Sequence, residues 1–181
     1  MLAQNLEERH FQTGTAGHNQ IRSIINYANE AAEHASDLQR GLMPVQMERA
    51  GLAQALQELA SNTDVLPEVD CVYTHDGATD VRDSETKLQL YRIAQEATNN
   101  ALKHAEPSTV TITLTSTDDT LHLTVEDDGT GFDVEQATRD SLGLHSMYYR
   151  ARAINAELEV QSVHDEGTTV HCMMQHAERE A

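Results

Sequence analysis

One helix-forming segment, residues 84–104, carries polar residues whose types and spacing suit phosphate chemistry. These residues recur about once per turn on a side separate from the apolar positions: Arg92, Glu96, Asn100 and Lys103. A carboxylate and an amide one turn apart, with a lysine one turn further on, span roughly 10 Å and suit a magnesium-bound polyphosphate. The alternative is a solvated outer face. Against it, two consecutive asparagines in mid-helix lower the helix propensity without breaking the pattern.

A second candidate lies where an apolar strand runs into acids and glycines. Val125 is followed by Glu126, Asp127, Asp128 and Gly129 in a row, and by a further glycine two residues later. Glycine lets backbone approach a ligand closely, and an acid at a strand end can accept a hydrogen bond from an amino group such as that of adenine. The same residue types also form plain acidic turns.

Two further segments could contact a phosphate or close a pocket. The segment 141–147, Ser-Leu-Gly-Leu-His-Ser-Met, stands at a predicted helix start, where free N–H groups and the helix dipole attract phosphate. Gly167-Thr168-Thr169 lies in a predicted turn. An ordinary capped helix and an ordinary hairpin turn are the alternatives.

The elements around these segments predict an α+β fold. Strands are expected where apolar residues alternate or cluster, at 69–74, 110–114, 121–125, 158–160 and 170–174. The last four form two β-hairpins, the first around a turn at Asp118-Asp119. Helices on one face of a mixed, mostly antiparallel sheet make a two-layer sandwich.

The expected helices follow the apolar periodicity of 3.6 residues. A short helix begins at Gly51, a second runs over 84–104 with Ser84 as its N-cap, and a third runs over 142–155. The segment between Phe132 and Ser141 is expected to be a flexible lid, because it offers no apolar anchors.

A long amphipathic helix is predicted ahead of this unit. Apolar residues from Ile21 to Leu42 form one stripe that needs a partner, and Pro44 ends the helix. A loop at 13–17 separates it from helix-like sequence at 1–10, so dimerisation would complete the bundle. The expected domains are therefore a partial dimerisation hairpin at 1–45 and a second domain at 46–181.

Composition narrows the classes of function. The 181 residues include 12 Lys+Arg against 30 Asp+Glu, a net charge of -18, so nucleic acid is a poor partner. No apolar run is long enough to span a bilayer, and no membrane contact is expected from these residues. Cys71 and Cys172 lack metal-like spacing, which predicts two buried thiols in a reducing compartment.

Together, the order and spacing of these motifs resemble the GHKL ATP-binding domains, within them the catalytic domain of nitrate-sensor-type bacterial sensor histidine kinases. Residues 92–105 resemble the family's N box, and residues 127–131 resemble its G1 box. Residues 142–147 resemble the G2 box, and residues 167–169 resemble the closing Gly-Thr. Residues 40–44 and 51–56 are similar to the family's connection between dimerisation helix and ATPase domain. The resemblance covers about Ile21 to Met174 and implies the Bergerat ATP-binding fold.

The resemblance also implies roles for individual residues. Glu96 would polarise a nucleophile or water, Lys103 would approach phosphate oxygens, and Asn100 would coordinate Mg²⁺. Asp127 would accept a hydrogen bond from the adenine amino group, and Thr168 would help to close the adenine pocket. The remaining nucleotide-binding positions would be Gly129 and Gly131, where backbone passes the nucleotide, and Gly143 and Leu144 in the G2 box. The G2 box and Ser141 before it are called the lid motif below.

Two features depart from the family pattern. Ser141 and Ser146 stand where the G2 box often has glycine. The phosphoacceptor motif, Glu-Leu-His-Asp followed by Gln, is absent, and neither His10 nor His18 matches it. We therefore expect the acceptor histidine to lie upstream, in the parent protein, and the present chain not to autophosphorylate.

The expected function is the ATP-binding catalytic module of a two-component sensor histidine kinase. The implied cofactors are ATP and Mg²⁺, and the implied partner is a response regulator receiver domain. The full-length protein is expected to be a homodimer. The module is expected to lie in the cytoplasm, whether or not the parent protein is membrane-anchored. One alternative is a GHKL-type serine kinase of the anti-sigma class, which the helical stripe disfavours. The other is a non-catalytic dimerisation or docking module, which Ser141 and Ser146 leave open.

Overall fold

The computed structural model describes residues 45–63, 69–77, 81–117 and 119–175, all within the unit Met43–Ala181. Its elements are α3 (Val45–Thr63), β1 (Asp70–Asp76), α4 (Ser84–His104), β2 (Thr109–Ser116), β3 (Thr120–Asp127), α5 (Val134–Asp140), α6 (Leu142–Ala153), β4 (Glu157–Val163) and β5 (Gly167–Gln175). The predicted dimerisation hairpin, with His10 and His18, lies outside the described residues. The domain boundary after residue 45 therefore stays a prediction.

The five strands form one sheet in the order β1-β2-β3-β5-β4. β1 pairs with β2 in parallel, and the other three pairings are antiparallel. The β3–β5 register sets Asp127 directly opposite Thr168, which brings the G1-box acid beside the closing Gly-Thr. This confirms the predicted mixed, mostly antiparallel sheet.

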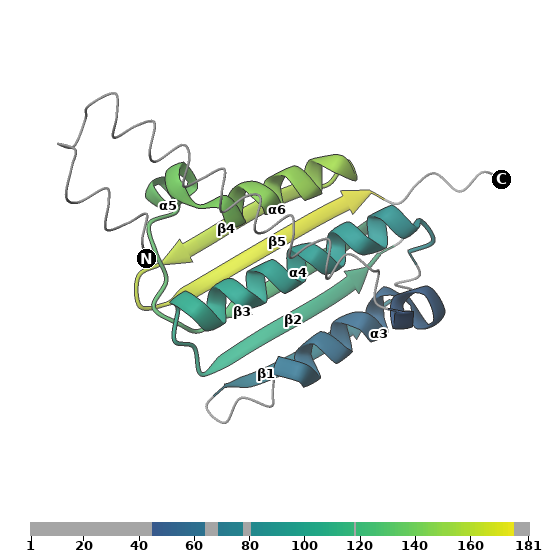
Figure 1. The fold of residues 1–181 in the computed structure, drawn as a ribbon, viewed down its shortest axis with the longest axis horizontal. Coiled ribbons are helices and arrows are strands. Elements are labelled where there is room, and N and C mark those ends of the chain that lie inside the picture. The colour runs from purple at the N-terminus through teal and green to yellow at the C-terminus, as the bar shows by residue number, and fades with distance from the viewer. Residues whose placement is uncertain (1–44, 64–68, 78–80, 118, 176–181) are drawn as a thin grey trace, which may run out of the picture. The chain divides into compact units, whose positions relative to one another are not determined.

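Helices α3, α4 and α6 lie on the same face of this sheet (Figure 1). Alternate strand residues are buried beneath them, among them Ile112, Leu123 and Val170, and Ile93 of α4 packs into the same core. Each strand therefore turns one set of side chains to the helices and the other set to the open face. The two-layer α+β architecture is confirmed.

The prediction that Ser84 caps α4 is wrong. The N-cap is Asp83, whose carboxylate accepts hydrogen bonds from the backbone N–H of Thr86 at 2.7 Å and from its hydroxyl at 2.6 Å. These two bonds lower the pKa of Asp83, the hydroxyl bond most. An ionised carboxylate accepts both bonds, whereas Ser84 already lies in the first turn of the helix.

The helix predicted to start at Gly51 is the second part of a longer kinked helix. α3 has helical residues on both sides of Gly51, whose own backbone is extended, at φ 84° and ψ 176°. Glycine reaches this combination without the Cβ clash of other residues, so the chain changes direction there.

The predicted flexible lid contains the short helix α5. Asp133 caps α5 by accepting a hydrogen bond from the backbone N–H of Gln136 at 3.0 Å. Phe132, Val134 and Ala137 pack against the hydrophobic core, so the expectation that no apolar anchors exist here was wrong. The cap and the i, i+3 spacing of Val134 and Ala137 were the signals that could have revealed it.

The predicted buried thiols are confirmed. Cys71 and Cys172 are both buried and neither forms a disulfide, and burial raises the pKa of the Cys172 thiol to about 12. Among the residues that the structure describes, no helix has both the length and the apolar content needed to cross a membrane.

Candidate functional site

A cavity of about 310 Å³ is lined by residues of α4, α6 and the helix-facing side of the sheet. Apolar side chains supply most of its walls, and Asn100, Asp127 and Thr168 are among its few polar contributors. Such a mostly apolar cavity with a few convergent polar groups is typical of small-molecule sites. Its complete lining is Ala97, Asn100, Ala101, His104, Ala105, Val125, Asp127, Gly131, Phe132, Ala137, Ser141, Leu144, Met147, Val160, Thr168 and Val170.

Asp127 ends β3 and lies at the cavity wall, half-buried. Its Oδ1 accepts a hydrogen bond from the backbone N–H of Gly129 at 3.0 Å. Burial raises the pKa of this carboxyl, and the backbone N–H groups of Gly129 and Thr168 oppose that shift in part. A carboxylate offers about four acceptor positions, so Asp127 retains capacity to accept from a ligand.

Asp128, the next residue, has a different task. Its exposed carboxylate accepts hydrogen bonds from the backbone N–H groups of Ser108 and Thr109, both at 2.8 Å. These bonds, chiefly the one from Thr109, lower the pKa of Asp128. Asp128 thus holds the start of β2, and only the first of the two adjacent acids lines the cavity.

Glu96 and Asn100 lie one turn apart on α4 and face the first turn of α6. A Cβ atom built on Gly143 would stand 2.4 Å from Oε1 of Glu96 and 3.3 Å from Nδ2 of Asn100. Gly143 is the second residue of α6 and has no positive φ. Glycine therefore fits here because it has no side chain and leaves space for the two α4 side chains. Its backbone conformation is one that other residues also adopt.

The predicted polar row on α4 divides in the structure. Arg92 is buried, and its guanidinium donates a hydrogen bond to Gln95 at 2.9 Å. Lys103, at the other end, is exposed. The middle pair, Glu96 and Asn100, is the part that meets α6, and of the four only Asn100 lines the cavity.

Gly129 and Gly131 are required by packing within the protein itself. A Cβ on Gly129 would lie 2.4 Å from the carbonyl oxygen of Ala105, and one on Gly131, where φ is +61°, would lie 2.1 Å from that of Val163. The backbone N–H of Thr130, between them, donates to the Ala105 carbonyl at 2.8 Å. The loop is thereby held against the end of α4, and Gly131 lines the cavity whereas Gly129 does not.

The lid-motif residues lie at the junction of α5 and α6. Ser141 caps α6 by accepting a hydrogen bond from the backbone N–H of Leu144 at 3.4 Å, and both residues line the cavity. Ser146 accepts a bond from Arg150 Nε at 3.2 Å. Both serines that depart from the family pattern therefore accept hydrogen bonds from residues of α6.

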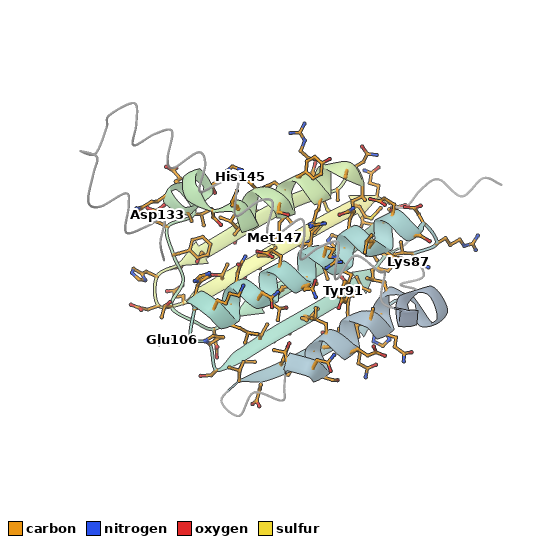
Figure 2. The ribbon with its side chains drawn as sticks, in the orientation of Figure 1. Lys87, Tyr91, Glu106, Asp133, His145 and Met147 are labelled. Atoms are coloured by element: carbon orange, nitrogen blue, oxygen red, sulfur yellow. The ribbon has the colours of Figure 1, made fainter. Side chains whose placement is uncertain are left out.

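Several wall residues were given no individual role in the site from the sequence. Met147 is buried and lies in the space between α6 and α4 (Figure 2), while Ala97, Phe132 and Val160 complete the apolar surface. Helical spacing predicted a core position for Ala97, and periodicity alone does not separate a residue that lines a cavity from one that fills a core. On the polar side, the hydroxyl of Thr168 lies 2.9 Å from that of Ser162.

Residues 85–178, more than half of the chain, match the family model described as "Histidine kinase-, DNA gyrase B-, and HSP90-like ATPase". The chain belongs to this family. The predicted GHKL membership is thereby confirmed, and the nitrate-sensor subtype stays a prediction.

Similar proteins of known name are sensor kinases. Sensor histidine kinase LiaS of Bacillus subtilis is 34% identical over 154 residues, which cover 83% of this chain and 41% of LiaS. Sensor protein VraS of Staphylococcus aureus is 41% identical over 81 residues, 45% of this chain and 23% of VraS. The chain thus spans less than half the length of these relatives.

The fold also matches a solved structure, the histidine kinase domain of a blue-light activated histidine kinase from Erythrobacter litoralis. The TM-score is 0.61 at 21% identity, and the match covers 95% of this chain and 92% of that domain. At this identity the comparison supports the shared fold.

Proposed function

We propose that this chain is the ATP-binding catalytic module of a two-component sensor histidine kinase. The observation that carries the proposal is the placement of Asp127 on an otherwise largely apolar cavity, with Asn100 on the opposing helix and Glu96 one turn away. A mostly apolar cavity with a half-buried carboxylate in its wall suits a flat heterocycle that carries an amino group. A carboxylate and an amide near its wall suit the polyphosphate end with its metal.

At the adenine end, the ionised Asp127 accepts a hydrogen bond from the exocyclic amino group. Thr168, which pairs with Asp127 across the sheet, and Gly131 contribute to the wall, and Leu144 contributes to it from α6. The half-buried position of Asp127 excludes part of the competing water, which strengthens the hydrogen bond relative to an exposed acid.

At the phosphate end, Asn100 is the proposed Mg²⁺ ligand. Mg²⁺ usually keeps several waters and takes one or two protein oxygens besides the phosphates, so a single amide oxygen is a sufficient contribution. When bound, Mg²⁺ neutralises phosphate charge, which a chain with a net charge of -18 needs before it can hold a polyanion. Lys103 approaches the phosphates from the end of α4. Gly129 and Gly143 serve this end indirectly, because Gly129 lets the loop pack against Ala105 and Gly143 leaves room for Glu96 and Asn100.

Glu96 is the residue proposed to polarise the nucleophile. In the full protein that nucleophile is a histidine upstream of this sequence, which receives the γ-phosphoryl group before an aspartate of a response regulator receiver domain takes it. The named relatives are sensor kinases of which this chain covers less than half, and they support this assignment. A homodimer in the full-length protein, a cytoplasmic location and the domain division at residue 45 belong to the same proposal.

The test is calorimetric titration of the chain with a non-hydrolysable ATP analogue, with and without Mg²⁺. Asp127→Asn should weaken binding at least about tenfold, because a hydrogen bond to a charged acceptor is lost. Asp128→Asn is the matched control, since it changes the adjacent acid that holds β2, and it should bind like the parent chain. No binding by the parent chain would instead support the non-catalytic docking module.

The upstream position of the acceptor has its own test. Incubation of the chain with Mg-ATP should yield no phosphohistidine. Phosphate mapped to His10 or His18 by mass spectrometry would contradict this part of the proposal and leave the nucleotide site unaffected.

A further inference from the structure

Two histidines from neighbouring strands meet on the open face of the sheet, away from the cavity. Nδ1 of His122 on β3 lies 3.0 Å from Nε2 of His171 on β5. The rings are nearly parallel, with 4° between their planes. Their sequence neighbours Leu121, Leu123, Val170 and Cys172 are buried under the helices, so alternation turns both rings to the other face.

The outer nitrogen of His122 also has a partner. Its Nε2 lies 2.8 Å from the hydroxyl of Thr120, on the same face of the same strand. In the tautomer of His122 whose Nε2 proton is donated to Thr120, the Nδ1 lone pair is directed to His171. A second partner that orients the ring in this way is the usual arrangement of metal-ligating histidines.

The separation of the two ring nitrogens suits one metal ion. With metal–nitrogen bonds of about 2.0–2.1 Å, two nitrogens 3.0 Å apart subtend an angle of about 95° at the metal. This is close to the cis angle of square-planar and octahedral centres and smaller than the tetrahedral angle. The ion sits beside the line between the nitrogens, so both partly exposed rings turn towards it. The His171 proton moves to its own Nδ1, and no net proton is lost.

The charge of the surrounding face favours a cation. Glu159 lies directly opposite His171 on β4, and Met173 lies directly opposite His122 on β5. None of the five strands contains a lysine or an arginine. Carboxylates without competing cations attract a metal ion, and the neighbouring thioether favours a softer one.

We infer that His122 and His171 together bind one divalent transition-metal ion of the copper, nickel or zinc class on the open face of the sheet. Among the described residues no cluster of three or more His, Cys, Asp and Glu side chains is placed to hold a metal, so water completes this two-histidine site. Imidazole ligands and the cis angle rank Cu²⁺ first and exclude Mg²⁺, which prefers oxygen. The site is independent of the nucleotide cavity.

The test follows the imidazole carbon-bound protons by NMR while the full chain is titrated with CuCl₂. Sub-stoichiometric Cu²⁺ should broaden the resonances of His122 and His171 before those of the chain's other histidines, and MgCl₂ should leave them unchanged. Earlier or equal broadening at other histidines would overturn the inference. This experiment needs no substitution, so the folding of a variant does not affect its outcome.

Substitutions then test the affinity. His122→Gln and His171→Gln should each weaken Cu²⁺ binding at least about tenfold, since loss of an outer-shell partner alone typically costs about 10–100-fold. His75→Gln, on β1, is the matched control and should bind like the parent chain. Unchanged Cu²⁺ affinity in both of the first two variants, with circular dichroism showing them folded, would refute the site. ATP-analogue binding should be the same in all three variants.

Discussion

Replacement of Gly143 by alanine separates a need for space from a need for flexibility in the lid motif. The backbone at Gly143 is helical, so alanine should be favoured by up to about 1 kcal/mol through helix propensity. Against this, the new Cβ would stand 2.4 Å from Oε1 of Glu96, where ordinary contact begins at about 3.4 Å. The carboxylate must therefore move by about 1 Å.

The energetic cost of this movement is small because Oε1 is the far end of a flexible side chain. An off-rotamer torsion costs about 0.5–1.5 kcal/mol, which is close to the gain in propensity. Gly143→Ala should thus leave the free energy of unfolding nearly unchanged. The same change should lower the Mg²⁺-dependent part of ATP-analogue affinity, since Nδ2 of Asn100 would also lie only 3.3 Å from the added carbon.

A double-mutant cycle provides the assay. Urea unfolding is measured for the parent chain, Gly143→Ala, Glu96→Ala and the double variant. When Glu96 is already truncated, the added methyl meets no carboxylate, and alanine should give its full propensity gain. The coupling energy between the two positions should therefore be about 0.5–1.5 kcal/mol, as for residues in contact. A coupling energy below about 0.3 kcal/mol would refute the reasoning. A Gly143→Ala variant that is already unfolded without urea would refute it as well.

Further predictions concern three single side chains. Thr98 is 1% exposed and its hydroxyl has no hydrogen-bond partner, so Thr98→Val should stabilise the domain by about 1 kcal/mol in urea unfolding; a lower midpoint would contradict this. Burial raises the pKa of Asp127, so ATP-analogue affinity should begin to fall on acidification at a higher pH than for an ordinary carboxyl. Burial of the ionised carboxylate costs free energy in the folded state. Asp127→Asn should therefore unfold at a higher temperature than the parent chain at neutral pH, while it binds less nucleotide. A lower melting temperature would count against the burial argument. Asp128 has a lowered pKa, so the stability it contributes is present above its ordinary pKa and is lost as pH falls through the lowered value. Asp128→Ala should therefore lower the urea midpoint at neutral pH and change it less in acid, with nucleotide affinity retained; equal loss at both pH values would contradict the assigned hydrogen bonds.

Much of the fold was predictable because it depends on local periodicity. Alternation of polar residues, mostly threonine, with valine, isoleucine or leucine predicted β2 and β3, and helical spacing predicted α4 and α6. The N-cap of α4 and the short helix α5 were missed. Both depend on one side chain reaching a particular backbone N–H, a choice that neighbouring polar residues leave open in the sequence.

The candidate site divides in the same way. Residue types and their order indicated phosphate chemistry around Glu96 and Asn100, and the family comparison agrees with the predicted GHKL domain. By residue type alone, the adjacent acids Asp127 and Asp128 are equivalent. The family resemblance assigned the adenine contact to Asp127, and the structure places Asp127 at the cavity while Asp128 holds β2. Likewise, the row that begins at Arg92 gave no sign that this arginine is buried.

By itself, the sequence determined which chemical groups the chain carries, the period on which they recur and the order of the motifs. The tertiary structure decided which groups meet. His122 and His171 come together because two antiparallel strands pair in one register, and Gly143 faces Glu96 because α6 packs beside α4. Such contacts join residues far apart in the chain, and their distances are set by strand register and helix packing, which no local pattern encodes.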